Sequence, residues 1–270
     1  MRTLTVFLAC LLSTAPALAG TLDLQGAFQQ GGMVVGKTEP GAVVSYADRS
    51  VRVAADGTFV IGFHRDEPAT VPLEVEHPDG SQTRRALTVA PREYVIQRID
   101  GLPPKKVTPP PEQIARIRRE AALVRAARAR DTDETWFAGS WIWPVEGRVS
   151  GVYGSQRILN GQPRQPHFGI DIAAPEGKPF VAPADGVVSL VHDDMYFSGG
   201  TLMVDHGHGV QSTFLHAKTI AVREGDVVRQ GDVLGTVGAT GRATGAHLDW
   251  RINWFDKRLD AALLVPPMGE

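Results

Sequence analysis

Histidine and aspartate side chains recur at short spacings in the C-terminal half of the chain. His167 and Asp171 are four residues apart, and His247 and Asp249 are two apart. Because side chains alternate along a β-strand, each pair is predicted to share one strand face. Imidazole and carboxylate groups are suitable ligands for Zn²⁺, and a catalytic zinc site has three protein ligands and one open position. The spacing therefore predicts a metal site built from His167, Asp171 and one member of the second pair, with His216 at the end of another strand.

The other residues that can bind metals restrict this chemistry. Among the 270 residues there are eight histidines and a single cysteine, Cys10, so the chain can form neither an internal disulfide nor a multi-thiolate zinc site. Two histidines, His64 and His77, stand alone beside predicted turns and are expected to be exposed. Three more fall in predicted turns and are expected to have structural roles: His192, His206 and His208.

The candidate site residues belong to a segment whose pattern predicts an all-β domain over residues 136–265. Glycine is dense there, and short Val-rich runs alternate with turn signals. The residues between and after the second pair, Leu248, Trp250 and Ile252, fall on the opposite strand face and are predicted to be buried. The polar loop 155–166 leads directly into His167 and is a candidate groove wall or lid.

Residues 20–94 predict a separate antiparallel β-sandwich, because short alternating runs are broken by turn signals. Residues 95–135 predict a Pro-rich extended connector followed by a helix from Glu112 to about Arg130. The expected apolar face of this helix consists of Ile114, Ile117, Ala121 and Val124, and the other face is rich in arginine. That basic face is expected to be solvated, and docking on an envelope protein partner is the alternative.

Several segments of the 136–265 region also follow each other in a recognisable order. These segments are Pro166–Pro175, Val181–Val188, Val204–Gly207, Phe214–His216 and Gly245–Asp249. In residue types and spacing they resemble the motifs of the lysostaphin-type (LytM-like) zinc endopeptidases, which cut peptide cross-links of bacterial cell wall. The resemblance implies a small antiparallel β-sandwich with a groove above one zinc ion per chain, and peptidoglycan peptide stems as substrate.

Carried over position by position, the resemblance implies that His167 and Asp171 are zinc ligands. It makes His216 and His247 the two non-ligand histidines, one accepting a proton and the other stabilising the developing oxyanion, in an order that the sequence leaves open. The third family ligand is a histidine, and Asp249 stands in its place. Because two carboxylates would cancel the charge of the metal, we expect weaker or more alkaline activity than in a site with two histidines.

Two other functions compete with hydrolysis. The missing histidine at Asp249 favours a non-catalytic LytM-like module that binds peptidoglycan or activates a cell-wall amidase. The repeated Gly-Asp-Val turns also suggest a biotinyl or lipoyl carrier. A carrier needs a lysine at the hairpin tip, and the tip here is Arg229-Gln230-Gly231, so that function is excluded.

Charge and the N-terminal residues bear on partners and location. The formal net charge is −2, so the composition gives no reason to expect nucleic acid as a partner. Residues 1–19 have the basic start, apolar stretch and small-residue cleavage site of a signal peptide, and no later run is long enough to span a membrane. The alternative is that Cys10 ends a lipobox. We therefore expect an exported protein of the periplasm or cell envelope.

Overall fold

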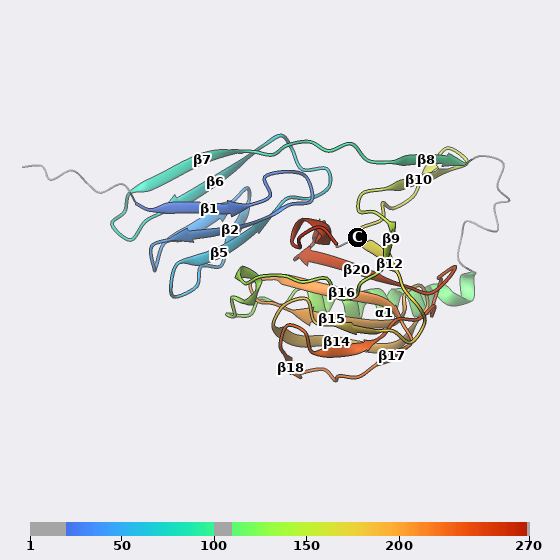
Figure 1. Ribbon diagram of the computed structural model, residues 1–270. Helices are drawn as coiled ribbons and strands as arrows, with labels where there is room; N and C mark the ends of the chain where they lie inside the picture. Colours follow the sequence, from blue (N-terminus) through green and yellow to red (C-terminus); the bar gives the residue numbers. More distant parts are fainter. Residues whose placement is uncertain (1–19, 100–109, 269–270) are drawn as a thin grey trace, which may run out of the picture.

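The computed structural model describes residues 20–99 and 110–268, which form two β-rich units packed side by side (Figure 1). The chain is mainly β, as the sequence predicts. The predicted signal peptide and most of the Pro-rich connector lie outside the described residues. Among the described residues, no helix combines the length and the apolar character needed to cross a membrane.

The N-terminal unit is the predicted antiparallel sandwich of two sheets. The first sheet has the order β1-β2-β5 and the second has the order β4-β3-β6-β7. The strands are β1 (Leu22–Gly26), β2 (Met33–Thr38), β3 (Val43–Tyr46), β4 (Arg49–Val51), β5 (Thr58–Gly62), β6 (Thr70–Glu76) and β7 (Gln82–Thr88). In β6 buried and exposed residues alternate strictly, so one face of its sheet packs in the sandwich and the other faces solvent.

Strand β5 departs from the predicted alternation, because all five of its residues are buried. One face packs inside the sandwich. The other lies against the C-terminal unit, since a side chain placed at Gly62 would collide with Leu259 at 2.8 Å and contact Trp254 at 3.1 Å. The ring of Trp254 also packs edge-on against Tyr46, with ring centroids 5.7 Å apart. The two units therefore share one continuous hydrophobic core.

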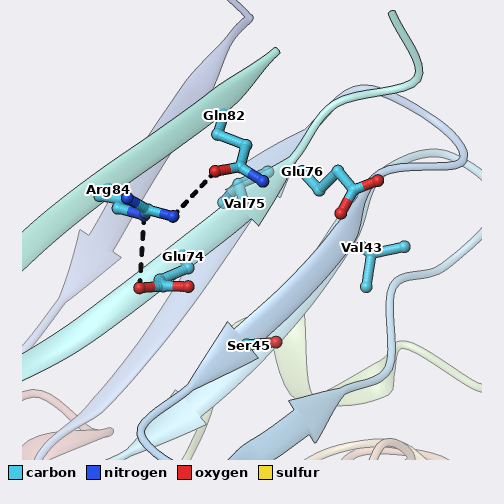
Figure 2. Close-up of a pocket in the computed structure, with 7 residues that line it drawn as sticks. All are labelled: Val43, Ser45, Glu74, Val75, Glu76, Gln82 and Arg84. Carbon is cyan, nitrogen blue, oxygen red and sulfur yellow. Dashed lines mark hydrogen bonds and ion pairs between the residues drawn. The ribbon is translucent and has the colours of Figure 1, made fainter. Parts of the chain in front are cut away.

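The outward face of the sheet β4-β3-β6-β7 carries a shallow hollow (Figure 2). Arg84 lies across it, donating to Gln82 at 2.9 Å and lying 3.5 Å from the carboxylate of Glu74. These are exposed side chains that pair with one another, so the hollow has the chemistry of a solvated sheet surface.

The prediction that His77 is exposed is wrong. Its side chain is buried at the end of β6, where Nδ1 lies 2.8 Å from Glu39 and Nε2 lies 2.8 Å from the Thr83 hydroxyl. Two polar partners satisfy both ring nitrogens, which allows the imidazole to be buried at a turn. His64 is half-buried and packs near the ring of Phe168 rather than standing free in a loop.

The connector contributes one strand to the C-terminal unit. Strand β8 (Ile96–Ile99) pairs in parallel with β10 (Gln156–Leu159), which also pairs with the short β11 (Gln162–Pro163). The polar loop before His167 is therefore a hairpin joined to the connector, seen at the upper right of Figure 1.

The 3₁₀ turn η2 (Pro111–Gln113) leads into α1 (Ile114–Arg128), the one α-helix among the described residues, which lies behind the strands β14 and β15 in Figure 1. Its packing face includes Ile117, Ala121 and Val124 of the predicted apolar face, all half-buried, but it extends beyond them and omits Ile114. Ile114 is exposed, whereas Glu120 and Ala127 are buried, and Val124 and Ala127 pack on Leu190, Met195 and Met203. Glu120 is buried because its carboxylate accepts from Arg116 at 2.6 Å and from the backbone of Tyr196 at 2.9 Å. The three arginines Arg119, Arg125 and Arg130 remain exposed, and docking of a partner there stays a prediction.

The C-terminal unit contains an eight-stranded sheet and a three-stranded sheet. The larger has the order β18-β14-β15-β16-β20-β12-β9, with β21 paired to β20, and the smaller has the order β13-β19-β17. Two 3₁₀ turns, η3 (Trp136–Ala138) and η4 (Ala261–Leu263), flank them. The strands are β9 (Arg148–Gly151), β12 (Ile170–Ala173), β13 (Pro179–Val181), β14 (Gly186–Met195), β15 (Gly199–Asp205), β16 (Val210–Ala217), β17 (Thr219–Ile220), β18 (Val227–Val228), β19 (Val233–Thr236), β20 (His247–Trp254) and β21 (Lys257–Leu259).

Three further histidines lie outside the candidate site. His206 and His208 follow β15 in a turn, as predicted, and both are buried. His206 Nδ1 lies 2.6 Å from the Asp185 carbonyl and Nε2 lies 2.7 Å from the Ser212 hydroxyl. The prediction that His192 falls in a turn is wrong, because it lies within β14, whose ladder with β15 continues through a register shift to Met195.

Candidate metal centre

The centre forms where β12 pairs with β20. In this antiparallel pair Asp171 lies directly opposite Asp249, so two carboxylates share one face of the sheet. On the other face of β20, Leu248, Trp250 and Ile252 are fully buried, as predicted. The burial of that apolar face sets the strand register and thereby turns both carboxylates to the same side.

His167 reaches the same place by a different route from the predicted one. It does not lie on the strand, because β12 begins at Ile170 and residues 164–168 have no regular structure before a bend at Gly169. The predicted i, i+4 placement on one strand face is therefore wrong in its local structure. The bend nevertheless returns the imidazole over the start of β12, where Nε2 lies 3.2 Å from Oδ1 of Asp171.

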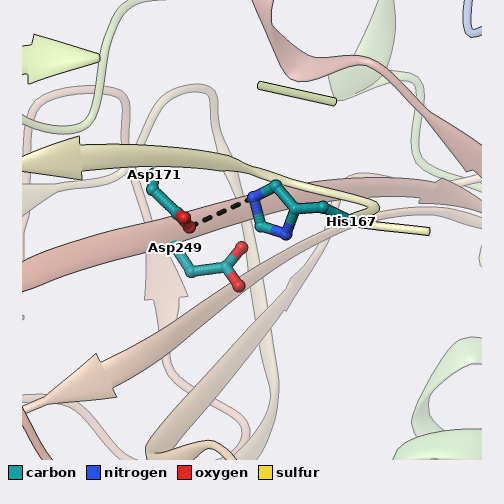
Figure 3. A group of neighbouring side chains, drawn as sticks. All are labelled: His167, Asp171 and Asp249. Carbon is teal, nitrogen blue, oxygen red and sulfur yellow. Dashed lines mark ion pairs between the residues drawn. The ribbon is translucent and has the colours of Figure 1, made fainter. Parts of the chain in front are cut away.

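The three side chains converge on one point (Figure 3). One ligand atom from each of His167, Asp171 and Asp249 lies within 4.8 Å of the other two. Within the described part of the chain, His167 Nε2 and Asp171 Oδ1 are buried and have no hydrogen-bond partner. Buried polar atoms that make no hydrogen bond are costly, and the 3.2 Å between these two atoms suits two ligands of one metal ion.

Two glycines make room for the carboxylates. A Cβ at Gly151 would lie 2.2 Å from Oδ2 of Asp171, and a Cβ at Gly169 would lie 2.1 Å from Oδ1 of Asp249. Both distances are far below van der Waals contact. Glycine is therefore required at these two positions for the carboxylates to occupy their places.

Arg251 is the one neighbour of the centre that the sequence reasoning missed. It lies two residues after Asp249 on the same face of β20, and its Nε donates to Oδ1 at 2.9 Å and to Oδ2 at 3.1 Å. Its Nη2 donates to Oδ2 at 2.5 Å. Burial alone would raise the pKa of Asp249, but the adjacent guanidinium outweighs burial and holds that pKa below its ordinary value. The sequence signal that could have identified Arg251 is its position two residues after Asp249, because residues two apart share one face of a strand.

His216 and His247 lie beside the cluster, with ring centroids 4.7 Å apart. Each ring is oriented by a backbone carbonyl, because His216 Nδ1 donates to Thr240 at 2.8 Å and His247 Nδ1 donates to Gly245 at 2.9 Å. A ring held in this way donates through Nδ1 and, in its neutral form, has Nε2 available as an acceptor. His247 Nε2 lies 3.9 Å from Asp171 Oδ1.

His216 has two further unusual properties. Its backbone φ is +67°, a left-handed conformation that a non-glycine residue rarely adopts. Burial lowers the pKa of its side chain and so favours the neutral ring. Strained, buried residues of this kind concentrate at functional sites.

The donor set fits a zinc ion. Ligands at about 2.0–2.1 Å from a tetrahedral zinc are separated by roughly 3.3 Å, close to the 3.2 Å between His167 Nε2 and Asp171 Oδ1. One imidazole nitrogen and two carboxylate oxygens are accepted zinc ligands. The free ring nitrogens of His216 and His247 would lie beside the open position.

The segment that contains the centre is similar in sequence to known proteins. The model of peptidase family M23 matches residues 165–261. The DD-carboxypeptidase/endopeptidase Mpg of Neisseria meningitidis serogroup B is 44% identical over 89 residues, which cover 32% of this chain and 20% of that protein. The peptidoglycan DD-endopeptidase ShyA of Vibrio cholerae serotype O1 is 34% identical over 130 residues, which cover 47% of this chain and 30% of that protein. This chain therefore matches less than a third of the length of either relative.

One solved structure matches nearly the whole chain. It is a crystal structure from Pseudomonas aeruginosa assigned to peptidase M23, and it is 32% identical with a TM-score of 0.66. The match covers 88% of this chain and 94% of that one, so both β units are included. Together with the family match over the centre itself, this similarity shows that the chain belongs to peptidase family M23.

Proposed function

We propose that this chain is an exported zinc-dependent endopeptidase that hydrolyses peptide cross-links of peptidoglycan, with one zinc ion held by His167, Asp171 and Asp249. The observation that carries the proposal is the convergence of these three side chains beside two oriented histidines, with His167 Nε2 and Asp171 Oδ1 buried and lacking hydrogen-bond partners. The peptidoglycan DD-endopeptidase among the relatives supports the substrate class. The signal-peptide pattern of residues 1–19 supports a location in the periplasm or cell envelope.

The residues divide the chemistry between them. Zinc supplies Lewis acidity, which polarises a carbonyl group and acidifies a water molecule. Buried, neutral His216 is suited to accept a proton at Nε2, because Nδ1 is committed to the Thr240 carbonyl. We assign the oxyanion contact to His247, whose ring is less buried and is fixed by the Gly245 carbonyl. This is our proposal for the order that the sequence leaves open.

The test combines metal content with cleavage. The purified full chain is loaded with zinc, dialysed and analysed for metal, and is then incubated with isolated peptidoglycan while newly released amino groups are counted. We expect about one zinc per chain and peptide release that stops on chelation and resumes when zinc is added back. Failure to bind zinc after supplementation would refute the proposal.

A second function is favoured by one observation, the contact of Arg251 with Asp249. If this pair replaces the metal, the chain is a non-catalytic module that binds peptidoglycan or activates an amidase. Such a module would sediment with peptidoglycan equally well with and without chelator, and would release no peptide amino groups. The same preparation therefore distinguishes the two functions.

A further inference from the structure

Arg251 changes the charge of the candidate centre. Two carboxylates alone give the ligand set a charge of −2, whereas the adjacent guanidinium reduces the local sum to −1. That sum equals the charge of one carboxylate with two neutral imidazoles. The Asp249 side chain is 3% exposed and that of Arg251 is 25% exposed, so solvent screens this pair poorly.

The contact also fixes the orientation of Asp249. The guanidinium donates from two of its nitrogens, and its contacts are concentrated on Oδ2, whereas Oδ1 accepts a single bond from Nε at 2.9 Å. A carboxylate oxygen has two lone pairs, so Oδ1 keeps one for a metal ion. Gly169 permits this arrangement, because a Cβ there would lie 2.1 Å from Oδ1 and 2.7 Å from Cγ of Arg251.

The alternative is that Arg251 takes the place of the metal ion. A substitute cation would be expected to pair with all the converging ligand atoms. Among the described residues, the Arg251 guanidinium hydrogen-bonds only Asp249, while His167 Nε2 and Asp171 Oδ1 are left without hydrogen-bond partners. The guanidinium thus supports one ligand and leaves the position between all three free.

We propose that Arg251 is a positioning residue that orients and charge-balances Asp249 so that an aspartate can act as the third metal ligand. The inference rests on the proposed zinc site. Outer hydrogen bonds to ligating groups commonly change metal affinity 10–100-fold. The need for Arg251 follows from the carboxylate at position 249 and disappears if that residue is an imidazole.

The experiment measures zinc affinity by competition with a chelating dye in the full chain. Arg251→Met removes the charge and the hydrogen bonds at similar volume, and Arg251→Lys keeps the charge without the planar fork. Arg229→Met is the matched control, because it removes the same side chain from an exposed turn. We expect roughly 10–100-fold weaker zinc binding in Arg251→Met, an intermediate loss in Arg251→Lys and no change in Arg229→Met.

A double-mutant cycle separates this role from general structural support. In an Asp249→His background the guanidinium faces an imidazole, so adding Arg251→Met should leave zinc affinity unchanged or improve it. Equal losses in the two backgrounds, or unchanged affinity in Arg251→Met alone, would overturn the inference while leaving the proposed function intact. If the unsubstituted chain binds no zinc, the proposed function fails, and zinc binding gained by Arg251→Met would identify the arginine as a substitute for the metal. Circular dichroism and the unfolding temperature establish whether each variant is folded. If Arg251→Met does not fold, Arg251→Lys provides the same comparison.

Discussion

At the scale of single residues, the free ring nitrogens of two histidines determine what the centre can do. His216 and His247 both donate Nδ1–H to a backbone carbonyl, which leaves each Nε2 as an acceptor. Neither ring needs a carboxylate to hold its tautomer. The backbone carbonyls of Thr240 and Gly245 therefore determine which nitrogen of each ring faces the cluster.

Replacing His216 with Gln separates proton transfer from metal binding. Gln removes the accepting imidazole but keeps a polar side chain, so we expect turnover of peptidoglycan to fall about 10²–10⁴-fold. Zinc content should not change, because His216 is outside the three-residue cluster. Turnover and metal content of His216→Gln are compared with those of His192→Gln, which alters a histidine outside the site. Loss of zinc from His216→Gln would show that it is a ligand.

His206 predicts a pH dependence of stability. Burial lowers its pKa from 6.5 to about 4, so the folded chain holds this ring neutral. As the pH falls below 6.5 the unfolded chain takes up a proton first, and the stability contributed by the neutral ring is lost between pH 6.5 and about 4. In this range the free energy of unfolding should fall by up to about 1.4 kcal/mol per pH unit, the slope for uptake of one proton.

The measurement is the free energy of unfolding in urea, determined for the unsubstituted chain and for His206→Asn at pH 7.5 and at pH 5. His208 and His216 also have pKa values lowered by burial and contribute in both proteins, so the difference between the two proteins isolates His206. A difference in stability that is the same at the two pH values would contradict the prediction.

The site residues show where reasoning from sequence succeeds and where it stops. Strand alternation predicts that His247 and Asp249 share a face, because an apolar partner face fixes the register. It fails for His167, whose position depends on a bend rather than a strand period. Arg251 was missed because same-face spacing gives proximity but does not give the side-chain conformation that joins it to Asp249.

At the scale of elements, α1 is attached to the sheet by a buried acid as well as by apolar contacts that include Val124 of the predicted face. Glu120 accepts from Arg116 on its own helix and from the backbone of Tyr196 after β14. Helical periodicity cannot identify such a contact, because a glutamate in a basic helix is expected to face water. The predicted existence and extent of the helix are nevertheless close to those observed.

Glu120→Ala should loosen this helix. The substitution leaves the N–H of Tyr196 without its partner, so we expect the free energy of unfolding to fall by about 1–2 kcal/mol. Hydrogen exchange in α1 should increase more than exchange in β16. Glu112→Ala, in the exposed turn η2, provides the control and should change neither quantity. Equal effects of the two substitutions would show that Glu120 does not anchor the helix.

At the scale of the whole molecule, the two β units are joined by polar as well as apolar contacts. Glu67 of the N-terminal unit is buried and accepts from the Tyr46 hydroxyl at 3.0 Å and from Lys257 of β21 at 2.6 Å. Arg92 and Asp260 form a second ion pair between the units at 2.8 Å. Together with Trp254 against Tyr46, these contacts make independent unfolding of either unit unfavourable.

Glu67→Gln tests this coupling. The amide keeps the shape of the side chain but removes its charge beside Lys257, so we expect about 1–3 kcal/mol lower stability. Calorimetry should give one unfolding transition for the unsubstituted chain and a single transition at lower temperature for Glu67→Gln. Glu74→Gln, on the exposed face of the same sandwich, should unfold like the unsubstituted chain. Two separate transitions in the unsubstituted chain would contradict the coupling.

The doubly buried strand β5 has a consequence for the order in which the chain folds. Its second face is covered by Trp254 and Leu259, which are synthesised about 190 residues after it. Until these residues emerge, an N-terminal sandwich that has already folded presents an apolar strand to its surroundings. Such partly folded species are prone to aggregate, so the chain is most vulnerable in the interval before Trp254 and Leu259 can cover β5.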